Sequence, residues 1–156
     1  MNNETTANHT IQKLKEIFEN NIEKRILVLG TTCLGKTTLL KSLLECRDMD
    51  ALVWELLPKQ TQEELSASSW TDGMSQTWRK HVIEAKQIIK IEAGHPLFAA
   101  TSFDSDIIVY LNIDENTLRE RTKKRNIEYQ VAAENDNRIK EEIKRANLPT
   151  IVVDII

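Results

Sequence analysis

Two glycines, a lysine and a threonine occur at the spacing G-x-x-x-x-G-K-[ST], at positions Gly30, Gly35, Lys36 and Thr37. Glycines at these places let the backbone turn tightly and approach a ligand closely, so that N–H groups of a loop and a helix N-terminus can surround phosphate oxygens. The lysine adds a positive charge for the β- and γ-phosphates, and the threonine hydroxyl suits Mg²⁺. The pattern therefore predicts a site for a nucleoside triphosphate and its magnesium ion.

The segments on either side of this loop fit its mechanics. Residues 25–29 form a short apolar run that is typical of a strand, and the leucines after the loop recur at the spacing of a helix that faces a core. A glycine turn followed by an ordinary lysine-bearing helix is the alternative interpretation. The residues expected to bind ATP are Gly30, Thr31, Thr32, Cys33, Leu34, Gly35, Lys36, Thr37 and Thr38.

Length and composition favour a small single-domain enzyme. The chain has 156 residues and a formal net charge of −3, which gives no overall attraction to nucleic acid or to an anionic membrane. Its two cysteines, Cys33 and Cys46, form no C-x-x-C or zinc-binding pattern, and a reduced thiol in the loop favours the cytoplasm. No apolar run approaches the roughly 20 residues of a membrane span. Neither nucleic acid nor membrane is expected as a partner.

Strand-like and helix-like segments alternate along the chain. Residues 1–24 are expected to form a polar leader, disordered over 1–9, and an amphipathic helix over 10–23. The apolar face of that helix packs on the core, meets a second copy in a homodimer, or covers the sheet as a lid. Strands are predicted at 25–29, 51–57, 87–92, 106–113 and 150–156, helices at 73–86, 114–125 and 129–146, and a loop or broken helix at 59–72.

This alternation predicts an α/β fold, a three-layer α/β/α sandwich around a five-stranded parallel sheet, with the active site at the carboxyl ends of the strands. Glu55 and Glu92 fall at or near two of those predicted ends. Glu55 could accept a proton from an acceptor hydroxyl, and Glu92 could help to hold Mg²⁺ through water. A solvent-exposed strand end is the alternative for each. Asp104 and Asp106 are weaker candidates, because aspartates are common in turns.

A basic segment follows the predicted strand 106–113. Helical spacing places Arg121 and Arg125 one turn apart on one face, where both guanidinium groups could reach one polyphosphate and act in catalysis. Glu115, Glu120 and Glu128 supply counter-charges, so a solvated helix is the alternative.

The loop, the strand 106–113 and the segment 120–125 (ERTKKR) together resemble the small P-loop kinases, closest to the deoxynucleoside and thymidylate kinase group. Nucleoside-monophosphate and shikimate kinases are wider relatives. The resemblance covers roughly residues 25–156 and implies a P-loop NTPase type of fold, with Lys36 and Thr37 at ATP and Arg121 and Arg125 in a lid. Glu55 would match the carboxylate that deprotonates the acceptor hydroxyl. The chain departs from these families at residues 92–95 (EAGH), where they usually carry an arginine.

The expected function is therefore phosphoryl transfer from Mg·ATP to a small-molecule acceptor, a nucleoside or nucleotide. Arg79, Lys80 and His81 could hold a phosphate on that acceptor. The alternative is a nucleotide-binding NTPase or switch module that has no small-molecule acceptor. A regulatory GTPase is excluded, because its Asp-x-x-Gly and Asn-Lys-x-Asp elements do not occur at the required places.

Overall fold

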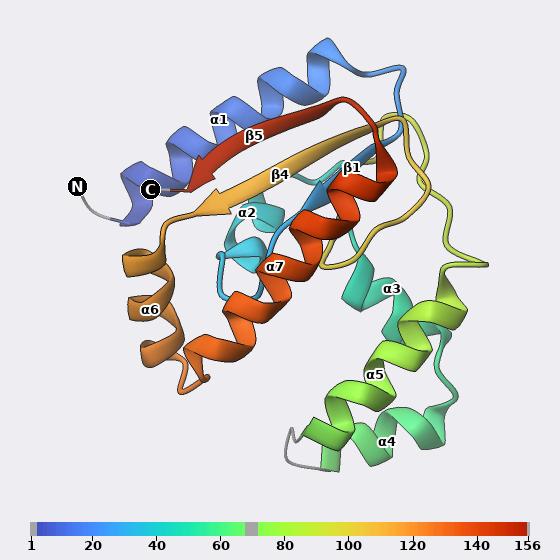
Figure 1. The fold of residues 1–156 in the computed structure, drawn as a ribbon. Helices are drawn as coiled ribbons and strands as arrows, with labels where there is room; N and C mark the ends of the chain where they lie inside the picture. The colour runs from blue at the N-terminus through green and yellow to red at the C-terminus, as the bar shows by residue number, and fades with distance from the viewer. Residues whose placement is uncertain (1–2, 68–71, 156) are drawn as a thin grey trace.

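The structure, a computed structural model, describes residues 3–67 and 72–155, and Figure 1 shows its fold. Five strands and the helices between them follow one another along the chain. In order they are α1 (Asn3–Asn20), β1 (Ile26–Leu29), α2 (Lys36–Ser42), β2 (Arg47–Asp48), α3 (Met49–Leu56), α4 (Lys59–Ala67), α5 (Asp72–Ala85), β3 (Leu97–Ala99), β4 (Ile107–Ile113), α6 (Glu115–Lys124), α7 (Tyr129–Ala146) and β5 (Thr150–Ile155).

All five strands are parallel and form one sheet in the order β2-β3-β1-β4-β5. At the end of β1, Leu29 pairs with Ala99 of β3 on one side and with Tyr110 of β4 on the other. After β1 the chain moves to β2 at one edge, and after β4 it moves to β5 at the other edge. Such a reversal leaves a crevice at the carboxyl ends of the two strands, and ligands of open α/β sheets bind there.

Helices cover both faces of the sheet (Figure 1). Because side chains of a strand alternate between faces, Val28 packs with α1 and α2, whereas Leu27 and Leu29 pack with α3, α5 and α7. The predicted α/β class with a five-stranded parallel sheet is confirmed, and helices on both faces fit the expected sandwich.

The N-terminal segment is helical much earlier than predicted. α1 begins at Asn3, so the expectation of a disordered leader over 1–9 is wrong for residues 3–9, and residues 1–2 lie outside the described part. Leu14 is fully buried and Phe18 nearly so, in the core on the α2 side of the sheet. The apolar face of α1 therefore packs on the core, which is the first of the three alternatives considered for it.

Two of the five predicted strands are wrong. The segment 51–57 lies mostly in α3, where Met49 and Val53 are buried four residues apart and the Asp48 side chain accepts a hydrogen bond from the backbone of Asp50 at the helix start. Residues 87–88 belong to a turn, residues 89–91 are irregular, and Glu92 forms an isolated bridge with His95. The strands that take their places, β2 and β3, are only two and three residues long.

The other predicted elements are confirmed in position. The strand 106–113 corresponds to β4, and α7 has the predicted bounds 129–146. Asp114 caps α6, since its carboxylate accepts a hydrogen bond from the backbone N–H of Thr117 at 2.8 Å. The segment 59–72 contains α4 up to Ala67, and its residues 68–71 lie outside the described part.

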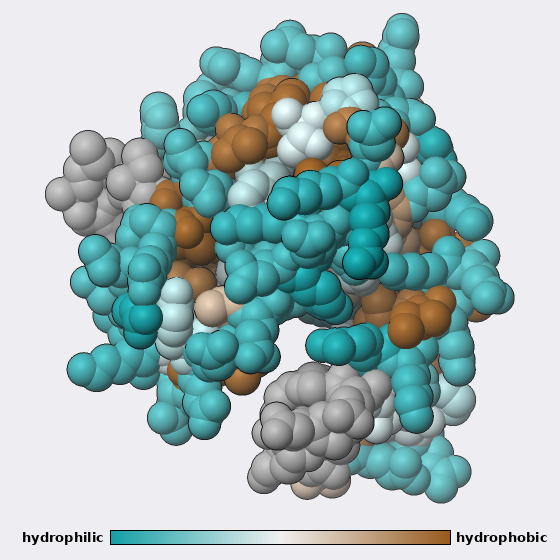
Figure 2. Space-filling view, viewed as in Figure 1, coloured by the Kyte–Doolittle hydropathy of each residue, from teal (hydrophilic) through white to brown (hydrophobic). Residues whose placement is uncertain are grey.

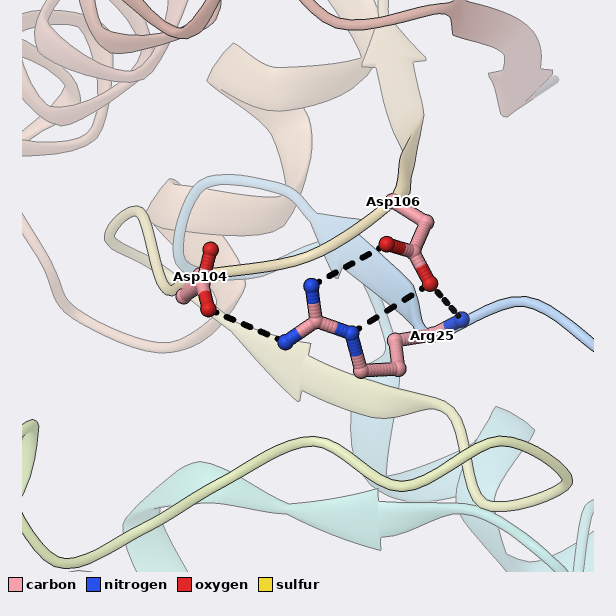
Figure 3. A network of polar contacts seen from close by, with 3 residues as sticks. All are labelled: Arg25, Asp104 and Asp106. Atoms are coloured by element: carbon pink, nitrogen blue, oxygen red, sulfur yellow. Dashed lines mark hydrogen bonds and ion pairs between the residues drawn. The ribbon is translucent and has the colours of Figure 1, made fainter.

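An ion-pair cluster ties the starts of β1 and β4 together at the amino edge of the sheet (Figure 3). The guanidinium of Arg25 lies between Asp104 and Asp106, with nitrogen-to-oxygen distances of 3.0 Å to each. The backbone N–H of Arg25 also donates to the Asp106 carboxylate at 2.8 Å. Asp104 and Asp106, the weaker catalytic candidates, therefore lie at the edge of the sheet opposite the glycine loop.

Candidate functional site

The glycine loop leaves the carboxyl end of β1, the central strand of the sheet, which lies between β3 and β4. Its backbone takes left-handed conformations at Cys33 (φ 67°) and Gly35 (φ 84°). Gly30 donates to Ala99 at 3.3 Å, and Thr32 and Cys33 form a turn; among the described residues, no acceptor is found for the backbone N–H groups of residues 35–38. A run of N–H groups without partners at a helix N-terminus is a binding site for an anion.

Gly30 and Gly35 must each be glycine, for different steric reasons. A Cβ on Gly30 would collide with the end of the Leu34 side chain and would lie 3.2 Å from the Cβ of Leu111. A Cβ on Gly35 would meet no clash, but the positive φ of this residue is a backbone conformation that other residues rarely adopt. The loop therefore closes tightly onto β4 at its start and turns sharply into α2 at its end.

Thr31 fixes the loop to α7. It is fully buried, and its hydroxyl donates to the carbonyl of Ala132 at 2.6 Å and accepts from the Asn135 amide at 3.3 Å. The side chain of Thr31 thus points into the protein, and the backbone of Thr31 is what remains for a ligand.

Lys36 is held in a desolvated position at the start of α2. Burial of its ammonium group lowers the pKa from 10.5 to about 8, and the carboxylates of Asp50 and Asp48 partly oppose this effect. Burial, with the neighbouring charge of Asp50, raises the pKa of Asp48. One cation and two carboxylates therefore lie near one another beside the loop.

Asp48 and Asp50 are the site residues that sequence reasoning missed. Asp48 ends β2, so it lies at the carboxyl edge of the sheet, where the sequence predicted a carboxylate at Glu55 instead. A local signal in the sequence could have found Asp48. An aspartate directly before apolar residues four positions apart, at 49 and 53, is typical of the start of a helix.

Arg121 contacts the loop. Its Nη1 donates to the Leu34 carbonyl at 2.8 Å and would lie 3.7 Å from a Cβ on Gly35. Arg125 lies one turn further along, at the C-terminal end of α6, and is exposed. Its side chain has no hydrogen-bond or ion-pair partner within the described ranges. Arg119, in contrast, is paired with Glu115 at 2.7 Å.

Glu55 and Glu92 are not brought to the loop. The strand ends on which both assignments depended do not exist, because Glu55 lies exposed in α3, about 10 Å along the helix from Asp48. Glu92 precedes β3 and therefore lies at the amino edge of the sheet, where it pairs with Arg47 at 3.5 Å. Thr37 is exposed in the first turn of α2, at the opposite edge from Glu92. The expected pairing of Thr37 with Glu92 around a magnesium ion is thus corrected.

Comparison with known proteins finds no family model that matches the chain and no curated protein that matches its sequence. Within the described ranges, no helix combines the length and the apolar character that crossing a membrane requires.

Proposed function

We propose that the chain is an ATP-dependent phosphotransferase of the P-loop kinase type, which moves the γ-phosphoryl group of Mg·ATP to a small-molecule acceptor. The observation that carries the proposal is the row of unpartnered N–H groups at residues 35–38, at the carboxyl end of the central strand of a parallel sheet. Arg121 and the desolvated Lys36 supply positive charge at the same loop. The proposed acceptor is a nucleoside or nucleotide, and the proposed compartment is the cytoplasm.

In this mechanism the loop N–H groups and Lys36 bind the phosphates of ATP, which add negative charge beside an ammonium group whose burial Asp50 and Asp48 compensate only in part. Thr37 offers a hydroxyl to the magnesium ion, whose chemistry is to neutralise charge on the phosphate oxygens. Arg121 and, beyond it, Arg125 are the proposed cations for the γ-phosphoryl oxygens during transfer.

Asp48 replaces Glu55 as the proposed general base. Its raised pKa makes its carboxylate a better proton acceptor than an ordinary aspartate. The acceptor oxygen forms a bond to the γ-phosphorus, its proton passes to Asp48, and the bond from that phosphorus to the β–γ bridging oxygen breaks. ADP and the phosphorylated acceptor are the products.

The test is a panel of nucleosides, nucleotides and other small hydroxyl compounds incubated with the protein and Mg·ATP. Mass spectrometry then detects acceptor plus one phosphoryl group. We expect acceptor-dependent formation of ADP that Lys36→Ala abolishes. Formation of ADP at the same rate without any acceptor, unaffected by Arg121→Ala, would contradict the kinase and support an NTPase or switch.

A matched pair of variants locates the base. Asp48→Asn keeps a good helix cap, so the fold should persist while the rate of transfer falls by about 10²- to 10⁴-fold. Glu55→Gln, on the exposed face of the same helix, should leave the rate unchanged. A normal rate in Asp48→Asn together with a reduced rate in Glu55→Gln would identify Glu55 as the general base instead.

A further inference from the structure

Three cationic side chains gather beside the loop that follows β3. Arg138 comes from α7, Arg79 from α5, and Lys86 from the turn directly after α5. Burial lowers the pKa of Arg138, and the neighbouring charge of Arg79 lowers it further. Burial likewise lowers the pKa of Lys86, and the charge of Arg138 lowers it further. Arg138 is therefore close enough to both Arg79 and Lys86 for their charges to repel its own.

Within the part of the chain that the structure describes, Arg138 forms hydrogen bonds with uncharged oxygens only. Its Nη2 donates to the carbonyl of Ala100 at 2.9 Å and contacts the amide oxygen of Asn135. Its Nε–H is buried and has no acceptor within the described part of the chain. Buried N–H donors are nearly always paired, so a missing partner at this guanidinium calls for an explanation.

One carboxylate lies within this group of cations. Glu142 favours the charged forms of both Arg138 and Lys86. Its two oxygens already accept hydrogen bonds, from the Thr101 hydroxyl at 3.0 Å and from the Ser102 backbone at 3.1 Å. Three positive charges and one negative charge leave an excess that a further anion would neutralise.

The cluster adjoins the glycine loop. Asn135, which contacts Arg138, also donates to Thr31, and the residue before Ala100 accepts from Gly30. Figure 2 shows the surface hollowed beside the part that carries α6 and α7, and the coloured side chains that border the hollow are mainly hydrophilic. A ligand at Arg138 would therefore be a close neighbour of phosphates on the loop.

We propose that Arg138, assisted by Arg79 and Lys86, binds an oxyanion, a phosphate or carboxylate, that the phosphoryl acceptor carries. Recognition of an oxyanion is a role to which a guanidinium group is well suited, because its N–H donors match the geometry of phosphate and carboxylate oxygens. Assignment of the anion to an acceptor rests on the proposed function, whereas the existence of the anion site does not. The acceptor would then be a nucleotide or another acidic compound in preference to a neutral nucleoside.

The anion site is tested by titration of the ¹⁵N-labelled protein with inorganic phosphate, with the arginine Nε–H resonances as the readout. The Arg138 signal is assigned by its absence in Arg138→Gln. We expect phosphate to shift that signal saturably, and Arg138→Lys, which keeps a charge, to retain part of the binding. Arg138→Gln should weaken phosphate binding at this site, read from nearby amides, by about tenfold or more. Arg145→Gln, exposed near the end of α7, is the matched control and should bind as the wild type does. An Arg138 signal that stays fixed while loop amides shift would overturn the proposal.

A second measurement asks whether the anion belongs to the acceptor. Transfer rates are compared for pairs of acceptors that differ only in one phosphate or carboxylate, such as a nucleoside and its 5′-monophosphate. We expect Arg138→Gln to raise KM about tenfold or more for the anionic member alone and to leave KM for ATP unchanged. An equal effect on both members would refute the assignment to the acceptor. Absence of any Lys36-dependent transfer would refute the proposed function instead, and the phosphate titration would still decide the anion site.

Discussion

Replacement of Lys36 by methionine should stabilise the protein while it abolishes nucleotide binding. The ammonium group of Lys36 is desolvated, and its pKa falls from 10.5 to about 8 despite the nearby carboxylates of Asp50 and Asp48. A factor of ten in proton affinity corresponds to about 1.36 kcal/mol, so the charged lysine costs up to about 3 kcal/mol in the folded state. Methionine has a similar length and no charge, so Lys36→Met should recover most of that free energy at pH 7.

The pH dependence distinguishes this cause from better packing. Below pH 8 the lysine is charged in both the folded and the unfolded state, and the full cost applies. Between pH 8 and 10.5 the folded state loses the proton first, so the unfolded state binds more protons and the free energy of unfolding rises with pH. The stability advantage of Lys36→Met should therefore shrink over this interval and vanish above it.

Urea denaturation followed by far-UV circular dichroism, at pH 7 and at intervals up to pH 10.5, measures the difference. Lys41→Met, exposed on the same helix, is the control and should change the free energy of unfolding by less than about 0.5 kcal/mol. Titration with Mg·ATP should show binding to the wild type and none to Lys36→Met. A variant that is less stable at pH 7, or an advantage that does not depend on pH, would refute the reasoning.

Three further predictions concern the scaffold. Tyr110→Phe removes the hydroxyl that donates to the buried Asp136 carboxylate, and urea denaturation should show a loss of about 1–3 kcal/mol; an unchanged value would mean that the carboxylate finds another donor. Asp106→Asn should lower Tm at pH 7. Because Arg25 holds the pKa of Asp106 below its usual range, the wild type should lose this advantage as pH falls through that lowered pKa, so the difference in Tm between wild type and variant should be smaller at pH 3 than at pH 7. Leu14→Ala should lower the free energy of unfolding by about 2–5 kcal/mol, since Leu14 is fully buried on the inner face of α1. A smaller loss would mean that α1 packs only weakly on the core.

The features that sequence reasoning placed correctly are those with local causes. The glycine loop depends on residues next to one another in the chain, and α7 has an apolar spacing that continues over its whole length. β4 is a seven-residue strand with nearly continuous burial, the pattern of a central strand in a parallel sheet. Each of these elements would be recognised without knowledge of its neighbours.

The features that were missed depend on pairing between distant segments. β2 consists of Arg47 and Asp48, which have no strand-like character of their own and become a strand through their pairing with Leu97 and Phe98. The apolar run 51–57 is compatible with a short strand or a helix, and only burial of Met49 and Val53 on the same side decides for a helix. One misplaced strand thus moved the predicted base from Asp48 to Glu55.

The pairing of β2 with β3 also bears on the free energy that burial of the Lys36 charge costs the folded state. By placing Asp48 and Asp50 near Lys36, β2 and α3 oppose part of the desolvation of the ammonium group, yet its pKa still falls to about 8. Two carboxylates therefore compensate the buried charge incompletely, and a polyphosphate on the loop would complete the compensation. On this reasoning the binding of Mg·ATP raises the pKa of Lys36, so that binding above pH 8 should be accompanied by uptake of a proton. Calorimetry of binding at pH 9 in buffers of different ionisation enthalpy measures that uptake, and its absence would mean that Lys36 does not contact the phosphates.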